Sequence, residues 1–191
     1  LGDVYKRQKQ RRLVKMVSDQ IRARENNTDT LVGVLSHIVE FRNGESGAHV
    51  RHIRIITEML LHRLLEISNN YSISAEQQDL IPLASTLHDI GKIKISDVVL
   101  NKPGKLTPEE FEVIKTHAES GGEIIEKTLT DIESDSYLKV AREMALYHHE
   151  KWNGTGYPYH LSGEDIPLCA RIMAVVDAVS YTHLTLPTNS R

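Results

Sequence analysis

The sequence has a single cysteine, few aromatic residues and no long apolar run. Because Cys169 is the only cysteine among 191 residues, an internal disulfide is excluded. Its apolar surroundings predict a core residue rather than a nucleophile. Apolar stretches such as 168–176 are far shorter than the roughly 18 residues that span a bilayer, and the charged N-terminus has no signal-peptide pattern. We therefore expect no membrane segment and a cytoplasmic location.

The chain also lacks a strong charge of either sign. Its formal net charge is −3, so there is no general basic field to hold a nucleic acid or an acidic membrane. Neither is expected as a partner. A length of 191 residues and a hydrophobic fraction of 40% are sufficient for one domain of ordinary size with an appendage.

Helical periodicity runs through most of the chain, and no run alternates every two residues as a half-buried strand would. The apolar residues within 31–38 and 50–64 predict two core helices joined at a tight corner at Asn43-Gly44. A charged amphipathic stretch over 9–30 predicts a lead-in helix that connects to something upstream. With no internal repeat, the predicted fold class is all-α.

Capping boxes and a proline mark several predicted helix boundaries. Ser74 with Gln77, and Thr107 with Glu110, each predict a helix start. Pro82 is expected to break or restart a helix. The other expected elements are a helix from 107 through His117 and beyond Gly121-Gly122, a helix over about 137–149, a Gly/Pro-rich loop over 152–163 and a last helix from near Asp165.

Histidine is the abundant chemical group, with ten in the chain. We interpret His37, His52, His62, His160 and His183 as ordinary surface or core residues. The candidate site residues are imidazoles and carboxylates that lie at or near helix ends, or on helices that can face a common centre. They are Glu45, His49, His88, Asp89, His117, His148, His149 and Asp177.

The spacing of these residues is compatible with one or two metal ions. Glu45 and His49 are four residues apart and share a face if the helix starts by Glu45. Adjacent residues on a helix diverge by about 100°, so the pairs 88–89 and 148–149 can reach two neighbouring metals or opposite sides of one. Nitrogen and oxygen donors without thiolate suit iron, manganese, cobalt, nickel or zinc.

Two motifs resemble a known family. His88-Asp89-Ile90-Gly91-Lys92 resembles the signature of the HD superfamily. His148-His149-Glu150 followed by Gly154-Thr155-Gly156-Tyr157-Pro158 resembles the second motif that names the HD-GYP family. The resemblance covers about residues 31–179, including 101–107 and 168–177. It implies an HD-superfamily helical bundle preceded by the lead-in helix.

The resemblance also implies roles for the candidate residues. One metal would be held by His49, His88, Asp89 and Asp177, and Asp89 would bridge to a second held by His117, His148 and His149. Glu45 matches a position that helps to bind a third ion in some members. The implied cofactors are thus two or three divalent ions, with iron or manganese favoured. Asp89 and Lys92 would be catalytic, and Lys92 would hold a phosphate or the leaving oxygen. Gly156, Tyr157 and Pro158 would form a substrate rim or a partner surface.

The function implied by this resemblance is a metal-dependent phosphodiesterase that opens a cyclic dinucleotide to a linear dinucleotide, or further to mononucleotide. Cyclic di-GMP is the usual substrate of the family, and some members prefer a mixed guanine-adenine cyclic dinucleotide. The alternatives are a non-catalytic HD-GYP module that binds nucleotide or a partner protein, and another HD-type nucleotide phosphohydrolase, against which the GYP loop argues. The implied partners are an upstream sensory or receiver-like domain and a protein that docks at the GYP loop; a homodimer is a further option.

Both ends of the chain depart from the adjoining patterns. Residues 1–8 and 180–191 resemble adapter-like tails of fragmentary predicted proteins, which leaves a lead-in over 9–30 and an HD-GYP domain over 31–179. The family normally continues beyond Asp177 with a helix that supplies an arginine and a lysine to the substrate phosphate. We therefore expect a domain that is truncated at its C-terminus, and a chain that binds metal but hydrolyses its substrate poorly.

Overall fold

The computed structural model describes residues 12, 14–16, 19, 20, 29–42, 47–68, 70–129 and 136–184. The chain divides into two compact units, residues 1–34 and residues 35–191. Every described residue of the first unit is helical, including the six between 12 and 20 within the predicted lead-in helix. The rest of that helix up to residue 28, and the predicted corner at Asn43-Gly44, lie outside the described residues.

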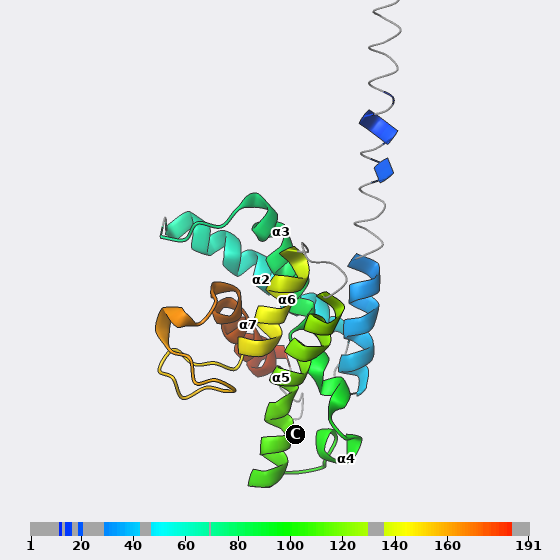
Figure 1. Ribbon diagram of the computed structural model, residues 1–191, viewed down its shortest axis with the longest axis vertical. Helices are drawn as coiled ribbons and strands as arrows, with labels where there is room; N and C mark the ends of the chain where they lie inside the picture. The colour runs from blue at the N-terminus through cyan, green and yellow to red at the C-terminus, as the bar shows by residue number, and fades with distance from the viewer. Residues whose placement is uncertain are drawn as a thin grey trace, which may run out of the picture. The chain divides into compact units, whose positions relative to one another are not determined.

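The second unit consists of helices and their connections (Figure 1). After the helix over 29–42, its elements are α2 (Gly47–Ile67), α3 (Ala75–Ala84), η1 (Ser85–Leu87), η2 (Ile90–Lys94), α4 (Asp97–Leu100), α5 (Pro108–Leu129), α6 (Ser136–Tyr147), η3 (Gly163–Asp165) and α7 (Leu168–Leu184). Among the described residues the only extended pairing is an isolated bridge between Asn153 and Ser162. The predicted all-α class is confirmed. No helix in the described ranges is long and apolar enough to cross a membrane.

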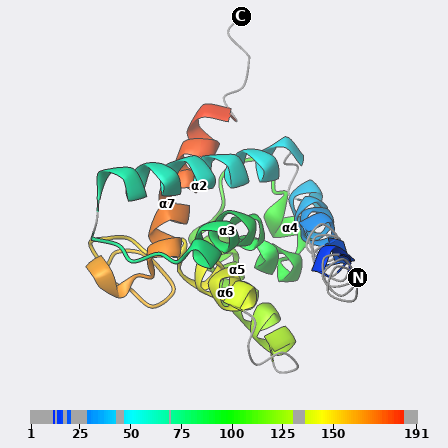
Figure 2. The same ribbon diagram turned by 90° about the horizontal axis from the view of Figure 1, so that it is seen from above.

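The core of the second unit lies between α2, α3, α6 and α7. Figure 2 shows α2 running across α7, and α2 also packs on α3, while α6 contacts α3, α5 and α7. Ile53 and Leu61 on α2, Met144 on α6 and Met173 on α7 are almost completely buried. Cys169 on α7 is buried as predicted, and burial together with the Glu143 carboxylate raises the pKa of its thiol.

The predicted capping boxes are both present. The Ser74 hydroxyl accepts from the Gln77 amide, and the Gln77 side chain accepts from the Ser74 amide, at the start of α3. Thr107 and Glu110 make the same reciprocal pair at the start of α5, with distances of 3.2 and 2.7 Å. Local sequence therefore determines where these two helices begin.

Pro82 does not break its helix, and that prediction is wrong. Helix α3 continues through Pro82 to Ala84. A proline lacks the amide hydrogen that would donate to the carbonyl four residues earlier, so α3 forgoes one backbone bond at Pro82 and still continues for two more residues. The hydroxyls of Ser85 and Thr86 then donate to the carbonyls of Pro82 and Leu83 at 2.7 and 2.8 Å, which satisfies the helix end.

The prediction of which side of the helix over 29–42 faces the core is also wrong. Leu35 and Ile38 are 53% and 51% exposed, whereas Ser36, Val39 and Glu40 are buried. The apolar period identified a helix, but the face that is buried carries two polar residues. A buried polar face is accommodated only where its groups find partners inside the protein.

The later helices differ from prediction at their ends. Helix α6 stops at Tyr147, so His148 and His149 lie in the turn that follows it. Residues 163–165 form the short helix η3, and α7 begins only at Leu168, after Pro167. Helix α7 continues past Val179, the predicted end of the family-like sequence, to Leu184.

Candidate metal centre

His88 and Asp89 lie between the short helices η1 and η2. His88 has helical backbone angles, whereas Asp89 leaves the helix with φ −99° and ψ 11°. This break allows two consecutive side chains to be buried together, with exposed fractions of 2% and 6%. The interruption of the helix therefore presents both an imidazole and a carboxylate to the interior.

Gly91 brings this segment against α5. A Cβ at Gly91 would overlap the carbonyl oxygen of His117, and it would lie only 2.5 Å from the amide nitrogen of Gly121. Only glycine permits this approach of η2 to α5. The contact places Asp89, two residues before Gly91, beside the His117 imidazole.

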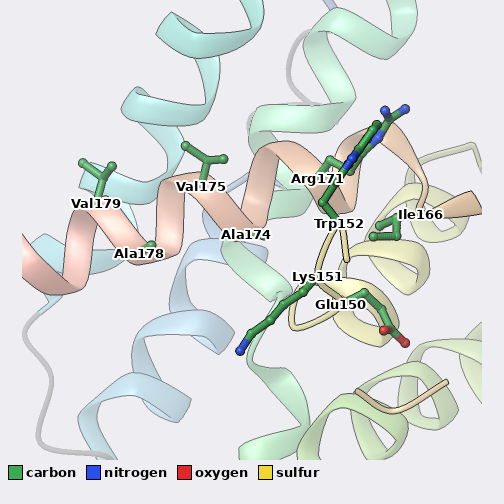
Figure 3. A pocket seen from close by; sticks show the side chains of 9 residues that line it. All are labelled: Glu150, Lys151, Trp152, Ile166, Arg171, Ala174, Val175, Ala178 and Val179. Carbon is green, nitrogen blue, oxygen red and sulfur yellow. The ribbon is translucent and has the colours of Figure 1, made fainter. Parts of the chain in front are cut away.

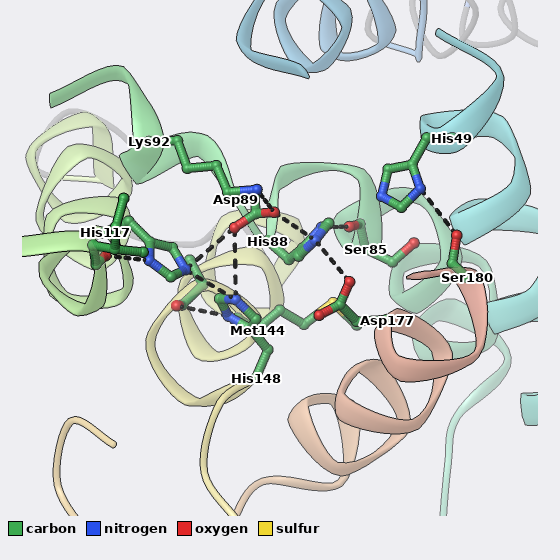
Figure 4. A network of polar contacts seen from close by, with 12 residues as sticks. His49, Ser85, His88, Asp89, Lys92, His117, Met144, His148, Asp177 and Ser180 are labelled. Atoms are coloured by element: carbon green, nitrogen blue, oxygen red, sulfur yellow. Dashed lines mark hydrogen bonds and ion pairs between the residues drawn. The ribbon is translucent and has the colours of Figure 1, made fainter. Parts of the chain in front are cut away.

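Asp89 uses its two oxygens toward different groups (Figure 4). Its Oδ1 lies 3.2 Å from Nε2 of His117 and 3.8 Å from Nε2 of His148. Its Oδ2 lies 3.1 Å from Nε2 of His88 and 2.6 Å from Nζ of Lys92. A carboxylate that faces two groups of donors with separate oxygens has the geometry of a bridging ligand.

Backbone carbonyls fix the rings of three of these histidines. In each case Nδ1 donates to a carbonyl oxygen three or four residues earlier: 2.8 Å from His88 to Ser85, 2.7 Å from His117 to Ile114 and 3.0 Å from His148 to Met144. A carbonyl oxygen can only accept, so Nδ1 carries a proton and the other ring nitrogen, Nε2, is available as a ligand. Metal-binding histidines commonly have this support.

The convergence of these atoms fits a cation. Nε2 of His117 and Nε2 of His148 face each other at 3.3 Å, beside Oδ1 of Asp89. Two neutral imidazole lone pairs and a carboxylate repel one another unless a proton or a metal ion lies between them. His149 joins this group, in which the ligand atoms all lie within 4.8 Å of one another. Within the described part of the chain, the buried Nε2 of His88 and Oδ1 of Asp89 have no hydrogen-bond partner of good geometry.

A second group adjoins the first. Glu40, His49 and His88 are buried and place ligand atoms within 4.8 Å of one another. Nδ1 of His49 lies 3.0 Å from the Ser180 hydroxyl, and its other ring nitrogen is on the side toward His88 (Figure 4). Asp177 lies beside this group, with Oδ1 4.0 Å from Nε2 of His88 and a side chain that is 30% exposed.

The charges at the centre influence one another. Burial alone would lower the pKa of His88, but the neighbouring Asp89, with Asp177 and Glu40, raises it to about 9. Burial would raise the pKa of Asp89, but Lys92 and His88 hold it well below its ordinary value. The Asp89 carboxylate is therefore ionised at neutral pH.

The other end of the centre favours neutral imidazoles. Burial, followed by the effect of neighbouring imidazoles, lowers the pKa of His149 to about 3 and that of His148 well below its ordinary value. Neither ring has to lose a proton at neutral pH to bind a metal. Burial raises the pKa of Asp177.

The GYP loop reaches the centre through Tyr157. Its ring stacks on His149 with 4.7 Å between centroids, and Nζ of Lys115 lies 5.7 Å from the tyrosine centroid. The loop is held by the buried Glu150, whose Oε1 accepts from the Tyr159 amide at 2.7 Å. Gly156 is buried, and a Cβ there would overlap the backbone at Glu150.

A cavity of about 470 Å³ lies elsewhere (Figure 3). Its lining includes Trp152, Arg171, Val175 and Val179, and none of the predicted metal ligands. The Arg171 guanidinium lies 5.7 Å from the Trp152 ring centroid. The donors suited to metal chemistry are at the histidine cluster, so we place the candidate site there and not in this cavity.

The structure brings together most of the residues selected from sequence. His88, Asp89, His117, His148 and His149 converge, and Asp177 is adjacent to them. His49 also lies at the centre, in the group with His88. Lys92 is 14% exposed and contacts Asp89, Tyr157 contacts His149, and Gly156 and Pro158 flank Tyr157 in the loop. Glu45 lies outside the described residues.

Sequence reasoning missed Glu40 and Ser180. Glu40 lies nine residues before His49, outside the helical spacing that we searched. Ser180 carries no metal-binding group, and it was assigned to the C-terminal tail. The structure distinguishes Glu40 by its burial among exposed apolar residues, and burial cannot be read from sequence.

These features define a helical domain with a buried histidine and aspartate centre suited to divalent metal. Residues 33–186 match the family model described as HD domain. The chain therefore belongs to the HD domain family, as the motif at 88–92 predicted.

Curated relatives agree with the HD-GYP resemblance. The chain is 41% identical over 147 residues to the 3'3'-cGAMP-specific phosphodiesterase 2 of Vibrio cholerae. This alignment covers 77% of the chain and 26% of the relative. It is 39% identical over 171 residues to a cyclic di-GMP phosphodiesterase of the same organism, covering 86% and 35%. A cyclic di-GMP phosphodiesterase of Thermotoga maritima is 37% identical over 145 residues, covering 76% and 36%. The chain thus spans about a third or less of the length of each of these proteins.

Proposed function

We propose that this protein is a metal-dependent phosphodiesterase that hydrolyses a cyclic dinucleotide, with cyclic di-GMP as the first candidate substrate. The observation that carries the proposal is the bridging geometry of Asp89, whose oxygens face separate sets of buried imidazoles. The relatives described above are named for the hydrolysis of cyclic di-GMP or 3'3'-cGAMP, which supports the substrate class.

The residues divide the metal-binding role between two positions. His117, His148 and His149 face Oδ1 of Asp89, and His88 faces Oδ2, with His49 in its group. Divalent ions bound there would supply an activated water and neutralise phosphate oxygens, as two-metal sites do. Asp177 extends the acidic side of the site beside His88. We propose iron or manganese as the ions, as the family resemblance implies, and the nitrogen and oxygen donors are compatible with both.

Lys92 and the GYP loop would act on the substrate. Nζ of Lys92 is 2.6 Å from Asp89, so its ammonium can stabilise charge on a phosphate or leaving oxygen next to the bridge. The Tyr157 ring, stacked on His149, presents an aromatic edge to the same region. Gly156 and Pro158 hold that ring in place, so the loop would form the substrate rim. In-line displacement needs no protein nucleophile.

The remaining features of the proposal rest on the short apolar runs of the sequence, its charged lead-in stretch and its family resemblance. They are a cytoplasmic location, an upstream sensory or receiver-like domain joined through the lead-in helix, a partner protein at the GYP loop and a homodimer.

The test is product analysis with the metal-loaded protein. Incubation with cyclic di-GMP, 3'3'-cGAMP and linear nucleotides, followed by chromatography, should show a linear dinucleotide or mononucleotide from a cyclic substrate. Asp89→Asn should abolish the product, and the exposed Asp165→Asn serves as the matched control. Nucleotide binding without any product would support the non-catalytic module instead. Hydrolysis of linear nucleotides alone would indicate another HD-type phosphohydrolase.

A further inference from the structure

Glu40 is buried where its helix would be expected to bury an apolar side chain. It is 2% exposed, whereas its neighbour Phe41 is 74% exposed and Ile38 is 51% exposed. Burial of a carboxylate costs several kcal/mol unless opposite charge compensates it. Burial of Phe41 or Ile38 would have been favourable. Apolar burial accounts for Val39 on this face but not for Glu40, whose burial requires an interaction of its carboxylate.

Other carboxylates adjoin the group that contains Glu40. Its group includes His49 and His88, which are also buried. Asp89 and Asp177 lie 3.1 and 4.0 Å from Nε2 of His88. The ammonium of Lys92 is already 2.6 Å from Asp89. Glu40, Asp89 and Asp177 thus bring three carboxylates to this end of the centre, and buried carboxylates are commonly paired or coordinate metals.

The donor geometry identifies the form of that charge. One ligand atom each from Glu40, His49 and His88 lies within 4.8 Å of the other two, a spacing that a single ion can span. Two imidazole nitrogens and a carboxylate are a common ligand set for first-row divalent metals. The Ser180 hydroxyl occupies Nδ1 of His49, so the opposite nitrogen is the one directed to the site.

We infer that Glu40 is a direct ligand of the cation at the His49 and His88 end of the centre, an inference that rests on the proposed function. The Glu40 carboxylate would bind this cation from the helix over 29–42, near the start of the domain. Asp177 comes from α7, near its end. This assignment adds a ligand that the sequence motifs do not contain. It makes the orientation of the helix over 35–42 dependent on bound metal.

The test is Glu40→Gln, which removes the charge and preserves the size of the side chain. The wild-type protein should bind two manganese ions per chain by elemental analysis after gel filtration, and the variant about one. The affinity for the lost ion should fall by more than about 100-fold, since residues that only support a ligand cost roughly 10- to 100-fold. Glu58→Gln, which removes an exposed carboxylate from α2, is the matched control and should bind two ions.

The outcomes separate this inference from the proposed function. If Glu40→Gln retains two ions and loses no more than about 100-fold in affinity, Glu40 is not a direct ligand, and the phosphodiesterase proposal is unaffected. If the wild-type protein binds no metal, both fail. Should the variant not fold, anomalous diffraction from wild-type crystals containing manganese decides the question. A peak about 2.0–2.2 Å from a Glu40 oxygen supports the inference, and a centre without a peak at that distance overturns it.

Discussion

Gly91→Ala should disrupt the centre without altering a single donor atom. A Cβ at this position would lie 2.5 Å from the amide nitrogen of Gly121, and ordinary van der Waals contact begins at 3.4 Å. The two backbones must therefore separate by about 0.9 Å, and by more where the Cβ overlaps the His117 carbonyl. Overpacking of this kind costs about 1–3 kcal/mol of unfolding free energy.

The same shift would act on the distance between Asp89 and His117. These residues sit on the two segments that must separate, and Oδ1 of Asp89 is now 3.2 Å from Nε2 of His117. Metal-ligand distances vary by only about 0.2 Å, so a displacement several times larger should remove the ion held between them. A misplacement of about 1 Å can also reduce turnover roughly 100-fold.

The assay compares Gly91→Ala with Gly33→Ala. A Cβ at Gly33, within a helix, meets no atom within 4 Å, so that variant should be neutral or up to about 1 kcal/mol more stable. Urea unfolding and bound metal per chain are measured for both. Wild-type stability and full metal content in Gly91→Ala would refute the argument that η2 and α5 are held together by this glycine.

Three further predictions concern charge at the centre. Asp89→Ala should lose bound metal and hydrolysis together because both oxygens face ligands; full metal content with merely slowed turnover would contradict bridging. Lys92→Ala should keep its metal but lower kcat about 100-fold in steady-state assays, and unchanged kinetics would exclude a catalytic role. The metal-free protein should be most stable near pH 6.5 in urea titrations. As pH falls below 6.5, stability is lost because the unfolded chain protonates His148 and His149, whose folded pKa values are depressed. As pH rises from 6.5 to about 9, the contribution of His88 is lost because its folded pKa is raised. Each slope is at most about 1.4 kcal/mol per pH unit per histidine, and a flat profile would contradict these shifts.

The sequence predicted those parts of the molecule that local rules determine. The capping boxes at Ser74 and Thr107 fix helix starts through hydrogen bonds between residues three apart, which are visible in sequence. The HD motif contains His88 and Asp89, and the GYP-family motif contains His148 and His149, so a recognisable spacing marked these four residues. His49, His117 and Asp177 lie outside both motifs and were selected through the wider family resemblance.

The features that were missed depend on tertiary contacts. Apolar periodicity identified the helix over 29–42, but its buried face includes Glu40, whose neighbour His88 lies 48 residues further along the chain. Pro82 was judged by an interior-helix rule, whereas it lies in a last turn whose carbonyls the following hydroxyls satisfy. Ser180 meets His49 across 131 residues, a contact that no local pattern contains.

In the proposed phosphodiesterase centre, Asp89 joins two ions. The most direct measurement is turnover of cyclic di-GMP against bound manganese per chain, as metal-free protein is titrated from zero ions to saturation. Turnover should be negligible up to one ion per chain and should rise as the second ion binds, because the activated water and the neutralised phosphate both need the bridged pair. Full turnover at one ion per chain, or turnover that is independent of metal, would contradict the account.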